Sequence, residues 1–302
     1  MAMAKLVVVG VGLIGGSLAL ALREAGAVGT VVGVGRSQAN LDAARARGIV
    51  DRAHRVDGAW MAEVADADVV LLAAPVAQFP ALFATLAPKL GARTVVTDAG
   101  SSKADVVAAA RAALGTAFPR FVPAHPIAGS ERSGAAAAEA ALYRGRSVIV
   151  TPVAETSPAA VATVEAMWRA AGARVSRLAP DVHDRVLAAV SHLPHVLAHA
   201  FVAELAARDD AATLFAHAGP GFGDFTRIAA SSPEMWRDIA LGNRDALLAE
   251  LDRFRSALGA VRALVATGDG AALEALFNRA RDARLGWQAT RGGERGAAGE
   301  GE

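Results

Sequence analysis

The chain has 302 residues, of which 53% are hydrophobic and 20% are charged, and its formal net charge is +1. At about 100–200 residues per domain, this length predicts two domains that can bury a core without disulfides or metals. The sequence contains no cysteine, which excludes disulfides, thiolate zinc sites and iron–sulfur ligation and is consistent with a reducing compartment. The balanced charge gives no reason to expect a nucleic-acid or anionic-membrane partner.

Residues 1–10 lack the features of a signal peptide, which needs a basic start, a longer apolar stretch and a small-residue cleavage site. We take the apolar stretches of the chain to be interrupted by glycine or charge well before about 18 residues, so we expect no membrane-spanning helix. The sequence therefore predicts a soluble, cytoplasmic protein.

The first half of the chain alternates short apolar strands with helices. Strands are expected at residues 5–9, 30–34, 68–73, 94–98, 121–124 and 147–151. Helices are expected between them at residues 13–25, 41–47, 79–90 and 103–114. Continuous apolar strands that alternate with helices predict an α/β fold in which a parallel sheet is covered on both faces.

The pattern changes after Val175, where helical periodicity continues without a convincing strand. Helices are expected at residues 181–207, 210–218, 224–230, 233–242, 244–266 and 270–283. We place the boundary near Pro180, which gives domains of residues 1–180 and 181–290. Residues 291–302 are rich in Gly, Glu and Ala and are expected to be disordered.

The glycine-rich segment Gly10–Gly15 has the pattern GxGxxG between the first strand and the first helix. In that context the pattern indicates dinucleotide binding, although alone it would be weak. Gly10 would allow the tight turn, Gly12 the approach of backbone to a pyrophosphate, and Gly15 close packing of helix on strand. The alternative is a glycine-rich turn that binds no ligand. We assign to the cofactor the residues Gly10, Gly12, Leu13, Ile14 and Gly15.

The end of the second strand indicates which dinucleotide binds. An NAD site usually has Asp or Glu there, bonded to the ribose 2′-hydroxyl. This chain has Gly35, Arg36 and Ser37 instead, so no carboxylate would repel a 2′-phosphate, and Arg36 could pair with one. We therefore favour NADP and keep NAD as the alternative, in which Arg36 is a solvated residue that stacks on adenine. Ser37, Pro75, which ends the third strand, and Ser101 are also assigned to the cofactor.

Two motifs follow strands at the edge where open α/β sheets bind ligands. The first, Asp98–Lys103, includes Ser101, which could also be the N-cap of the helix that follows. The second runs from His125 to Glu131 and places a histidine between a strand and a proline. A neutral imidazole there can accept a proton from a substrate hydroxyl as hydride leaves. A lone histidine is more often structural, but this one lies beside the expected nicotinamide, and we assign His125 to catalysis.

Three histidines of the helical half, His192, His195 and His199, are spaced so that they could share one helix face. This spacing would permit metal binding. No metal-binding carboxylate motif accompanies it, however, and Pro194 would bend the helix, so we expect no metal site.

Arg227 lies in a mostly apolar segment near the start of a helix. Because an unpaired buried charge is very costly, we expect it to have an anionic partner. That partner is either Asp224, within the fold, or a substrate carboxylate, whose two oxygens a planar guanidinium can bind together.

Five motifs together resemble the prephenate/arogenate (cyclohexadienyl) dehydrogenase family. They are GxGLIGGS at Gly10–Ser17, DxGSxK at Asp98–Lys103, HPIAGSE at His125–Glu131, SHLPH at Ser191–His195 and DFTRIAxSxPxMW at Asp224–Trp236. The first is common to many dehydrogenases, but the other four in this order are specific. The resemblance implies a Rossmann-like doubly wound domain followed by an all-α dimerisation domain. It also implies oxidative decarboxylation of prephenate to 4-hydroxyphenylpyruvate, or of arogenate to tyrosine, with NAD or NADP.

Site roles follow from the resemblance position by position. His125 resembles the catalytic acceptor from the ring hydroxyl, Ser101 the residue that links this hydroxyl to the nicotinamide, and Arg227 the group that binds the ring carboxylate. The residues that would surround the substrate side chain, some from the partner subunit, are Glu131, His195, Asp224 and Trp236. Because the expected helices also have apolar residues on more than one face, we expect a homodimer.

Two other functions remain as alternatives. A two-domain dehydrogenase of β-hydroxy acids or imines usually depends on a lysine in its helical domain, whereas the only lysines here are Lys5, Lys89 and Lys103. A non-catalytic NADP sensor would keep the glycine motif without needing His125 or Arg227. Prephenate and arogenate differ only at the side-chain keto or amino group, and both remain candidate substrates.

Overall fold

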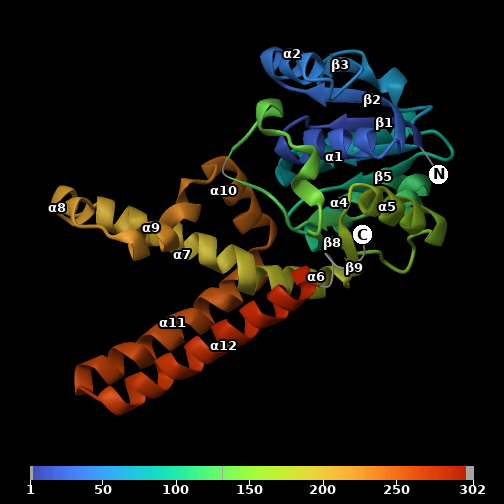
Figure 1. The fold of residues 1–302 in the computed structure, drawn as a ribbon. Helices are drawn as coiled ribbons and strands as arrows, with labels where there is room; N and C mark the ends of the chain where they lie inside the picture. Colours follow the sequence, from blue (N-terminus) through green and yellow to red (C-terminus); the bar gives the residue numbers. More distant parts are fainter. Residues whose placement is uncertain (1–2, 131, 297–302) are drawn as a thin grey trace. The chain divides into compact units, whose positions relative to one another are not determined.

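The computed structural model describes residues 3–130 and 132–296. By its contacts the chain divides into one unit that ends at Leu247 and a second that begins at Leu248. The larger unit holds the sheets together with the first helices of the helical part (Figure 1). Glu131 lies outside the described residues, as do residues 297–302, which belong to the segment expected to be disordered.

A six-stranded parallel sheet forms the centre of the larger unit, in the order β3-β2-β1-β4-β5-β6. Its strands are β1 (Met3–Val9), β2 (Val28–Gly35), β3 (Arg52–Arg55), β4 (Val69–Leu72), β5 (Val95–Asp98) and β6 (Phe121–Val122). This is the strand order of the doubly wound dinucleotide-binding fold. The α/β fold expected from the sequence is therefore confirmed.

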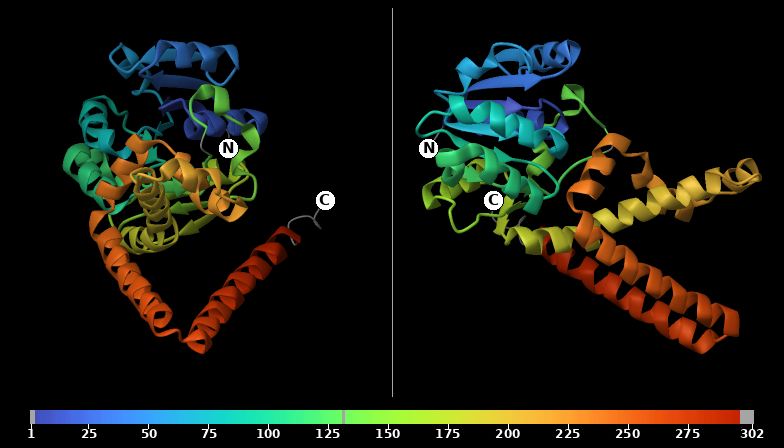
Figure 2. Two further views of the ribbon diagram at one scale, coloured as in Figure 1. Left: turned by 90° about the vertical axis from the view of Figure 1, so that its left-hand side faces the viewer. Right: turned by 180° about the vertical axis from the view of Figure 1, so that it is seen from behind.

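Helices cover both faces of this sheet (Figure 2). Because side chains alternate along a strand, Leu6 and Val8 of β1 belong to one apolar core, and Val7 and Val9 belong to the other. The first core includes α1 (Leu13–Glu24), α2 (Gln38–Ala46) and α5 (Pro158–Ala170), and the second includes α3 (Phe79–Leu86) and α4 (Ala104–Leu114). The helix α5 was not among the expected elements.

A second, three-stranded sheet was not expected. It contains β7 (Ala124–Pro126), β8 (Ser147–Val150) and β9 (Arg174–Arg177), with β8 antiparallel to β7 and parallel to β9. The expected strand 121–124 is interrupted at Pro123, so that β6 stays in the main sheet while β7 begins the second one. Proline has no backbone N–H to donate to a ladder, and the change of sheet at this residue places His125 on β7.

The helical part begins at Pro180, where we placed the domain boundary, but the compact unit continues to Leu247. Its helices are α6 (Pro180–Leu187), α7 (Leu193–Ala206), α8 (Ala211–Ala216), α9 (Pro220–Thr226), α10 (Pro233–Gly242), α11 (Arg244–Thr267) and α12 (Gly270–Gly296). The expected helix 224–230 is instead the end of α9 and a 3-10 turn, Arg227–Ala230. The helix α12 continues past Arg291, where we expected disorder to begin.

A π-helical turn, Ala188–His192, joins α6 to α7. Pro194 follows it in the first turn of α7, where its missing N–H is tolerated. The run Pro180–Ala206 is 27 residues long, with a mean hydropathy of 1.6 over its most apolar window. By length and composition it could cross a membrane, so our expectation that no stretch would qualify was wrong. Residues 186–203 contain no Gly, Asp, Glu, Lys or Arg.

Candidate active site

The glycine loop has the geometry that a dinucleotide requires. Gly10 has a φ of +104°, and a Cβ there would lie 2.4 Å from the carbonyl oxygen of Ala73. A Cβ on Gly15 would lie 2.3 Å from the carbonyl oxygen of Gly10, whereas Gly12 faces open space. No side chain caps the N-terminus of α1, so its N–H groups and positive dipole end can bind a pyrophosphate. These residues fit a dinucleotide.

A segment that follows the His125 loop holds this glycine loop in place. The Asn40 side chain on α2 donates to the carbonyl of Val11 (2.7 Å) and accepts from the N–H of Ala135 (2.7 Å). The Tyr143 hydroxyl donates to the carbonyl of Ile14 (2.6 Å). The glycine loop, which carries five of the residues assigned to the cofactor, is therefore held in place by hydrogen bonds from Asn40 and Tyr143.

At the end of β2, Gly35 leaves no carboxylate, as the sequence indicates. The Arg36 side chain is 63% exposed, and its Nη1 lies 3.9 Å from Oε1 of Glu234 on α10. Ser37 is the N-cap of α2, because its hydroxyl accepts from the N–H of Asn40 at 3.3 Å. Arg36 is thus available to a ligand, and Ser37 has a structural function that we did not expect.

Asp98 and Lys103 form a fully buried ion pair at the end of β5. Lys103 Nζ also donates to the carbonyl of Ala124 at 2.9 Å. The Asp98 carboxylate accepts from the N–H groups of Gly100 (2.8 Å) and Ala124 (3.1 Å). The pair therefore fixes both the turn that carries Ser101 and the backbone next to His125. The sequence had pointed to the motif but not to this function.

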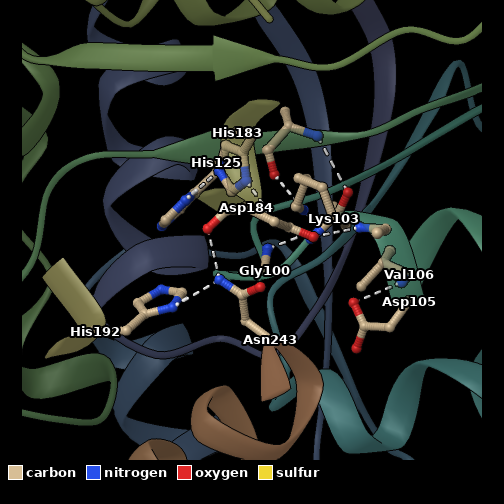
Figure 3. Close-up of polar contacts among 12 residues, drawn as sticks. Gly100, Lys103, Asp105, Val106, His125, His183, Asp184, His192 and Asn243 are labelled. Atoms are coloured by element: carbon tan, nitrogen blue, oxygen red, sulfur yellow. Dashed lines mark hydrogen bonds and ion pairs between the residues drawn. The ribbon is translucent and has the colours of Figure 1, made fainter. Parts of the chain in front are cut away.

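Figure 3 shows a hydrogen-bonded chain that begins at His125, which is 9% exposed. Its Nδ1 lies 2.9 Å from Nε2 of His183, and Nδ1 of His183 lies 2.8 Å from Oδ1 of Asp184. Burial lowers the pKa of His125 well below its usual value, and the positive charge of Lys103 lowers it further. His125 is therefore neutral at physiological pH and can accept a proton.

The N-terminus of α4 is capped by Asp184 from α6, not by Ser101 as we had considered. The Asp184 carboxylate accepts from the N–H groups of Lys103 (2.9 Å) and Ala104 (2.8 Å). The side chain of Lys103, at the N-cap position, makes no cap bond, and the Asp105 carboxylate accepts locally from the N–H of Val106 at 2.8 Å. Ser101, half-buried in the turn before α4, is therefore not needed as a cap and is available for the substrate.

Asn243 extends the chain to the histidine motif of α7. Its Nδ2 donates to the carbonyl of Asp184 (2.8 Å) and lies 3.0 Å from Nδ1 of His192. His192 is 1% exposed, and burial lowers its pKa to about 4. His183, Asp184 and Asn243 were not among the expected site residues, because no local motif marks contacts between residues this far apart in the chain.

His195 and Trp236 form the second part of the site. Their rings stack with centroids 3.7 Å apart and 18° between planes, and Nδ1 of His195 donates to the carbonyl of Ser191 (2.8 Å). Burial lowers the pKa of His195, and the charge of Arg227 contributes in the same direction. The structure thus brings together three of the residues expected around the substrate.

Arg227 and Asp224 are both exposed in the described chain. Our premise that Arg227 is buried was therefore wrong, because the apolar residues around it in the sequence do not cover it. It remains close enough to His195 for its charge to act there. Glu131, the remaining candidate, lies outside the described residues.

Comparisons with known proteins match both parts of the chain. Residues 18–177 match the family described as prephenate dehydrogenase, nucleotide-binding domain, and residues 179–279 match prephenate dehydrogenase, dimerization domain. The cyclohexadienyl dehydrogenase of Zymomonas mobilis is 35% identical over 92% of this chain and 94% of that protein. The prephenate dehydrogenase of Bacillus subtilis is 35% identical over 92% of this chain and 74% of that protein.

The fold comparison agrees with the sequence comparison. The crystal structure of A. aeolicus prephenate dehydrogenase in complex with hydroxyphenyl propionate and NAD+ superposes with a TM-score of 0.87 and 35% identity. The superposition covers 94% of this chain and 98% of that one.

Proposed function

Since the chain belongs to the prephenate dehydrogenase family, we propose that it catalyses the oxidative decarboxylation of prephenate to 4-hydroxyphenylpyruvate in tyrosine biosynthesis. The observation that carries this proposal is the buried, neutral His125 on β7, whose side chain is held by a hydrogen bond to His183 of the helical part. Arogenate is the alternative substrate, since one relative is a cyclohexadienyl dehydrogenase and the two substrates differ only at the side-chain keto or amino group.

The residues of this chain account for each proton and charge in that reaction. His125 Nε2 would accept the proton of the ring hydroxyl as the C–H bond of the same carbon breaks. A bound nicotinamide would accept the hydride. Ser101 would hydrogen-bond the same hydroxyl, and Arg227 would hold the ring carboxylate. The carboxylate then leaves as carbon dioxide, its bonding electrons complete the aromatic ring, and the resulting phenolate oxygen takes the proton back from His125. Formation of the aromatic ring makes the reaction strongly downhill.

A single assay tests this proposal against its alternatives. The purified protein is mixed with prephenate or arogenate and with NAD or NADP, and the absorbance of reduced nicotinamide is followed. We expect reduction with prephenate. Reduction only with a β-hydroxy acid would assign the chain to the other class of two-domain dehydrogenases. If the protein binds NAD or NADP but none of these substrates reduces the cofactor, the chain would be a non-catalytic sensor.

We propose that NADP is preferred over NAD. Gly35 has no carboxylate that would repel a 2′-phosphate, and the exposed Arg36 can form an ion pair with one. Arg36→Ala should raise the KM for NADP by about 10-fold or more, the value of one lost charge-assisted contact, with little effect on NAD. Glu234→Gln is the matched variant: it removes a carboxylate that competes for Arg36 and should lower the KM for NADP. Equal effects of Arg36→Ala on both cofactors would contradict the assignment.

Arg227→Ala should raise the KM for prephenate strongly while the melting temperature stays within about a degree. A charged contact of this kind contributes about 2–5 kcal/mol to binding, which is about 30-fold or more in KM. The side chain is exposed, so its loss should not unfold the protein. Arg227→Lys should restore little, because an ammonium cannot bind both carboxylate oxygens in one plane. A lower melting temperature with an unchanged KM would assign Arg227 to the fold.

We further propose a soluble, cytoplasmic homodimer formed through the helical part, consistent with the matched dimerization domain. Only 28% of the apolar window in Pro180–Ala206 is buried within the chain, so the rest requires cover. The same run holds His183 and Asp184 in a buried polar network, which would be costly in lipid. Light scattering at micromolar concentration should give the dimer mass without detergent. A monomer would contradict this proposal.

A further inference from the structure

The proton on a neutral histidine can be on either ring nitrogen, and the reaction proposed above permits only one choice at His125. The nitrogen that receives the hydroxyl proton, Nε2, must be unprotonated, so the single proton of the neutral ring must be on Nδ1. The inference below rests on that proposed function, because it concerns how His125 is kept in the form that the reaction needs.

Asp184 determines the direction of the hydrogen bonds toward His125. A carboxylate can only accept, so Nδ1 of His183, at 2.8 Å, is the donor to Oδ1 of Asp184. Nε2 of His183 lies 2.9 Å from Nδ1 of His125, and it must be the acceptor of this bond because the proposed reaction requires the proton on Nδ1 of His125. This leaves Nε2 of His125 without a proton. Two N–H groups at the N-terminus of α4 hold the Asp184 carboxylate in position.

At the other end of this series of hydrogen bonds, toward His192, the ring nitrogen nearest the series accepts a hydrogen bond and does not donate one. Asn243 Nδ2 must donate to the carbonyl of Asp184, which cannot donate, and its second N–H points to Nδ1 of His192 at 3.0 Å. His192 therefore accepts at Nδ1 and carries its proton on Nε2. That nitrogen is buried and has no protein partner among the described residues. In Figure 3 the rings of His125 and His192 lie at the two ends of this chain, on the same side of it.

We propose that Asp184 sets opposite tautomers at the two ends: through His183 it leaves His125 Nε2 as an acceptor, and through Asn243 it leaves His192 Nε2–H as a donor. His183 and Asn243 are thus positioning residues, and they touch no reacting atom. The arrangement gives the site one nitrogen for the substrate hydroxyl and one N–H for an oxygen acceptor of a bound ligand.

The first test reads the tautomers directly and needs no catalysis. The protein has seven histidines, so the 15N resonances of their rings can be assigned from single substitutions. At pH 7.5 we expect His125 to be protonated at Nδ1 alone and His192 at Nε2 alone. A proton on Nε2 of His125 in the parent protein would overturn the proposal, whether or not the protein oxidises prephenate.

The second test separates tautomer control from packing. His183→Phe keeps a ring of similar size but removes the acceptor, whereas the carbonyl of His183→Gln can still accept from Nδ1–H of His125. We expect His183→Phe to leave His125 in mixed tautomers and to lower kcat by about 10- to 100-fold, the usual range for a group that orients another. The KM for substrate and cofactor should change less than about threefold.

His183→Gln should retain most of the activity and the single His125 tautomer. His54→Phe, the same substitution on the edge strand β3, is the matched control and should leave kcat unchanged. If kcat falls equally in His183→Phe and His183→Gln, His183 acts through packing and not through the tautomer of His125. If His183→Phe does not fold, the tautomers of the parent and of His183→Gln still decide the question.

Discussion

Replacing His125 with asparagine is expected to lower kcat by about 100- to 10,000-fold, the range for the loss of a general acid–base group. Asparagine can still hydrogen-bond to His183, but it cannot accept a proton from the ring hydroxyl at physiological pH. The variant should bind the cofactor as tightly as the parent, because the glycine loop is held by α2 and Tyr143, away from β7. Steady-state kinetics with prephenate and the cofactor both at saturating concentration would measure kcat.

The control for this variant is His217→Asn, which changes an exposed histidine of the helical part and should leave kcat unaltered. A kcat for His125→Asn within about threefold of the parent would remove His125 from the mechanism. The pH dependence provides a second check. Because the pKa of His125 is lowered well below 6.5 by burial and neighbouring charges, its protonation should not reduce kcat/KM until the pH falls well below that value.

Lys103→Met is expected to have the largest effect on folding. The substitution leaves Asp98 fully buried without its counter-charge, and breaking a buried pair in this way costs about 3–5 kcal/mol. Urea unfolding at fixed protein concentration would measure the change in the free energy of unfolding. Lys89→Met, at an exposed lysine, is the matched control and should change stability by less than about 0.5 kcal/mol.

A second variant distinguishes loss of charge pairing from loss of packing. In Asp98→Asn/Lys103→Met no charge remains buried, so part of the stability should return. The single variant Asp98→Asn completes the comparison. If the loss of stability in the double variant equals the sum of the losses in Lys103→Met and Asp98→Asn, the two side chains act independently, and the loss of the ion pair does not explain the instability of Lys103→Met.

The sequence predicted the parts of the fold that depend on local pattern. Runs such as Val69–Leu72 are apolar on both faces, which identifies strands of a covered parallel sheet, and the glycine motif identifies the first turn. The strands β3 and β9 were missed because each is short and polar, with Arg at both ends. Their pairing comes from neighbours across the sheet, and no periodicity in their own residues indicates it.

The candidate site was predicted where a motif carries its chemistry in adjacent residues, as at His125. It was not predicted where chemistry depends on contacts distant in sequence: His183 lies 58 residues from His125, and Asn243 lies 59 residues from Asp184. The exposure of Arg227 shows the opposite error. Apolar neighbours in a sequence suggest burial, but in the short 3-10 turn Arg227–Ala230 the arginine side chain is exposed.

The capping of α4 by Asp184 also determines where this molecule can open. Any hinge movement that drew α6 away from α4 and β7 would uncap two N–H groups and break the hydrogen bond between His183 and His125, and loss of the cap alone costs about 0.5–2 kcal/mol. Between the end of β2 and α10, by contrast, the exposed side chains of Arg36 and Glu234 form a charged contact at 3.9 Å, and such a pair contributes little to stability. We therefore expect the cofactor to enter and leave on the Arg36 side, while the joint around Asp184 stays closed throughout turnover.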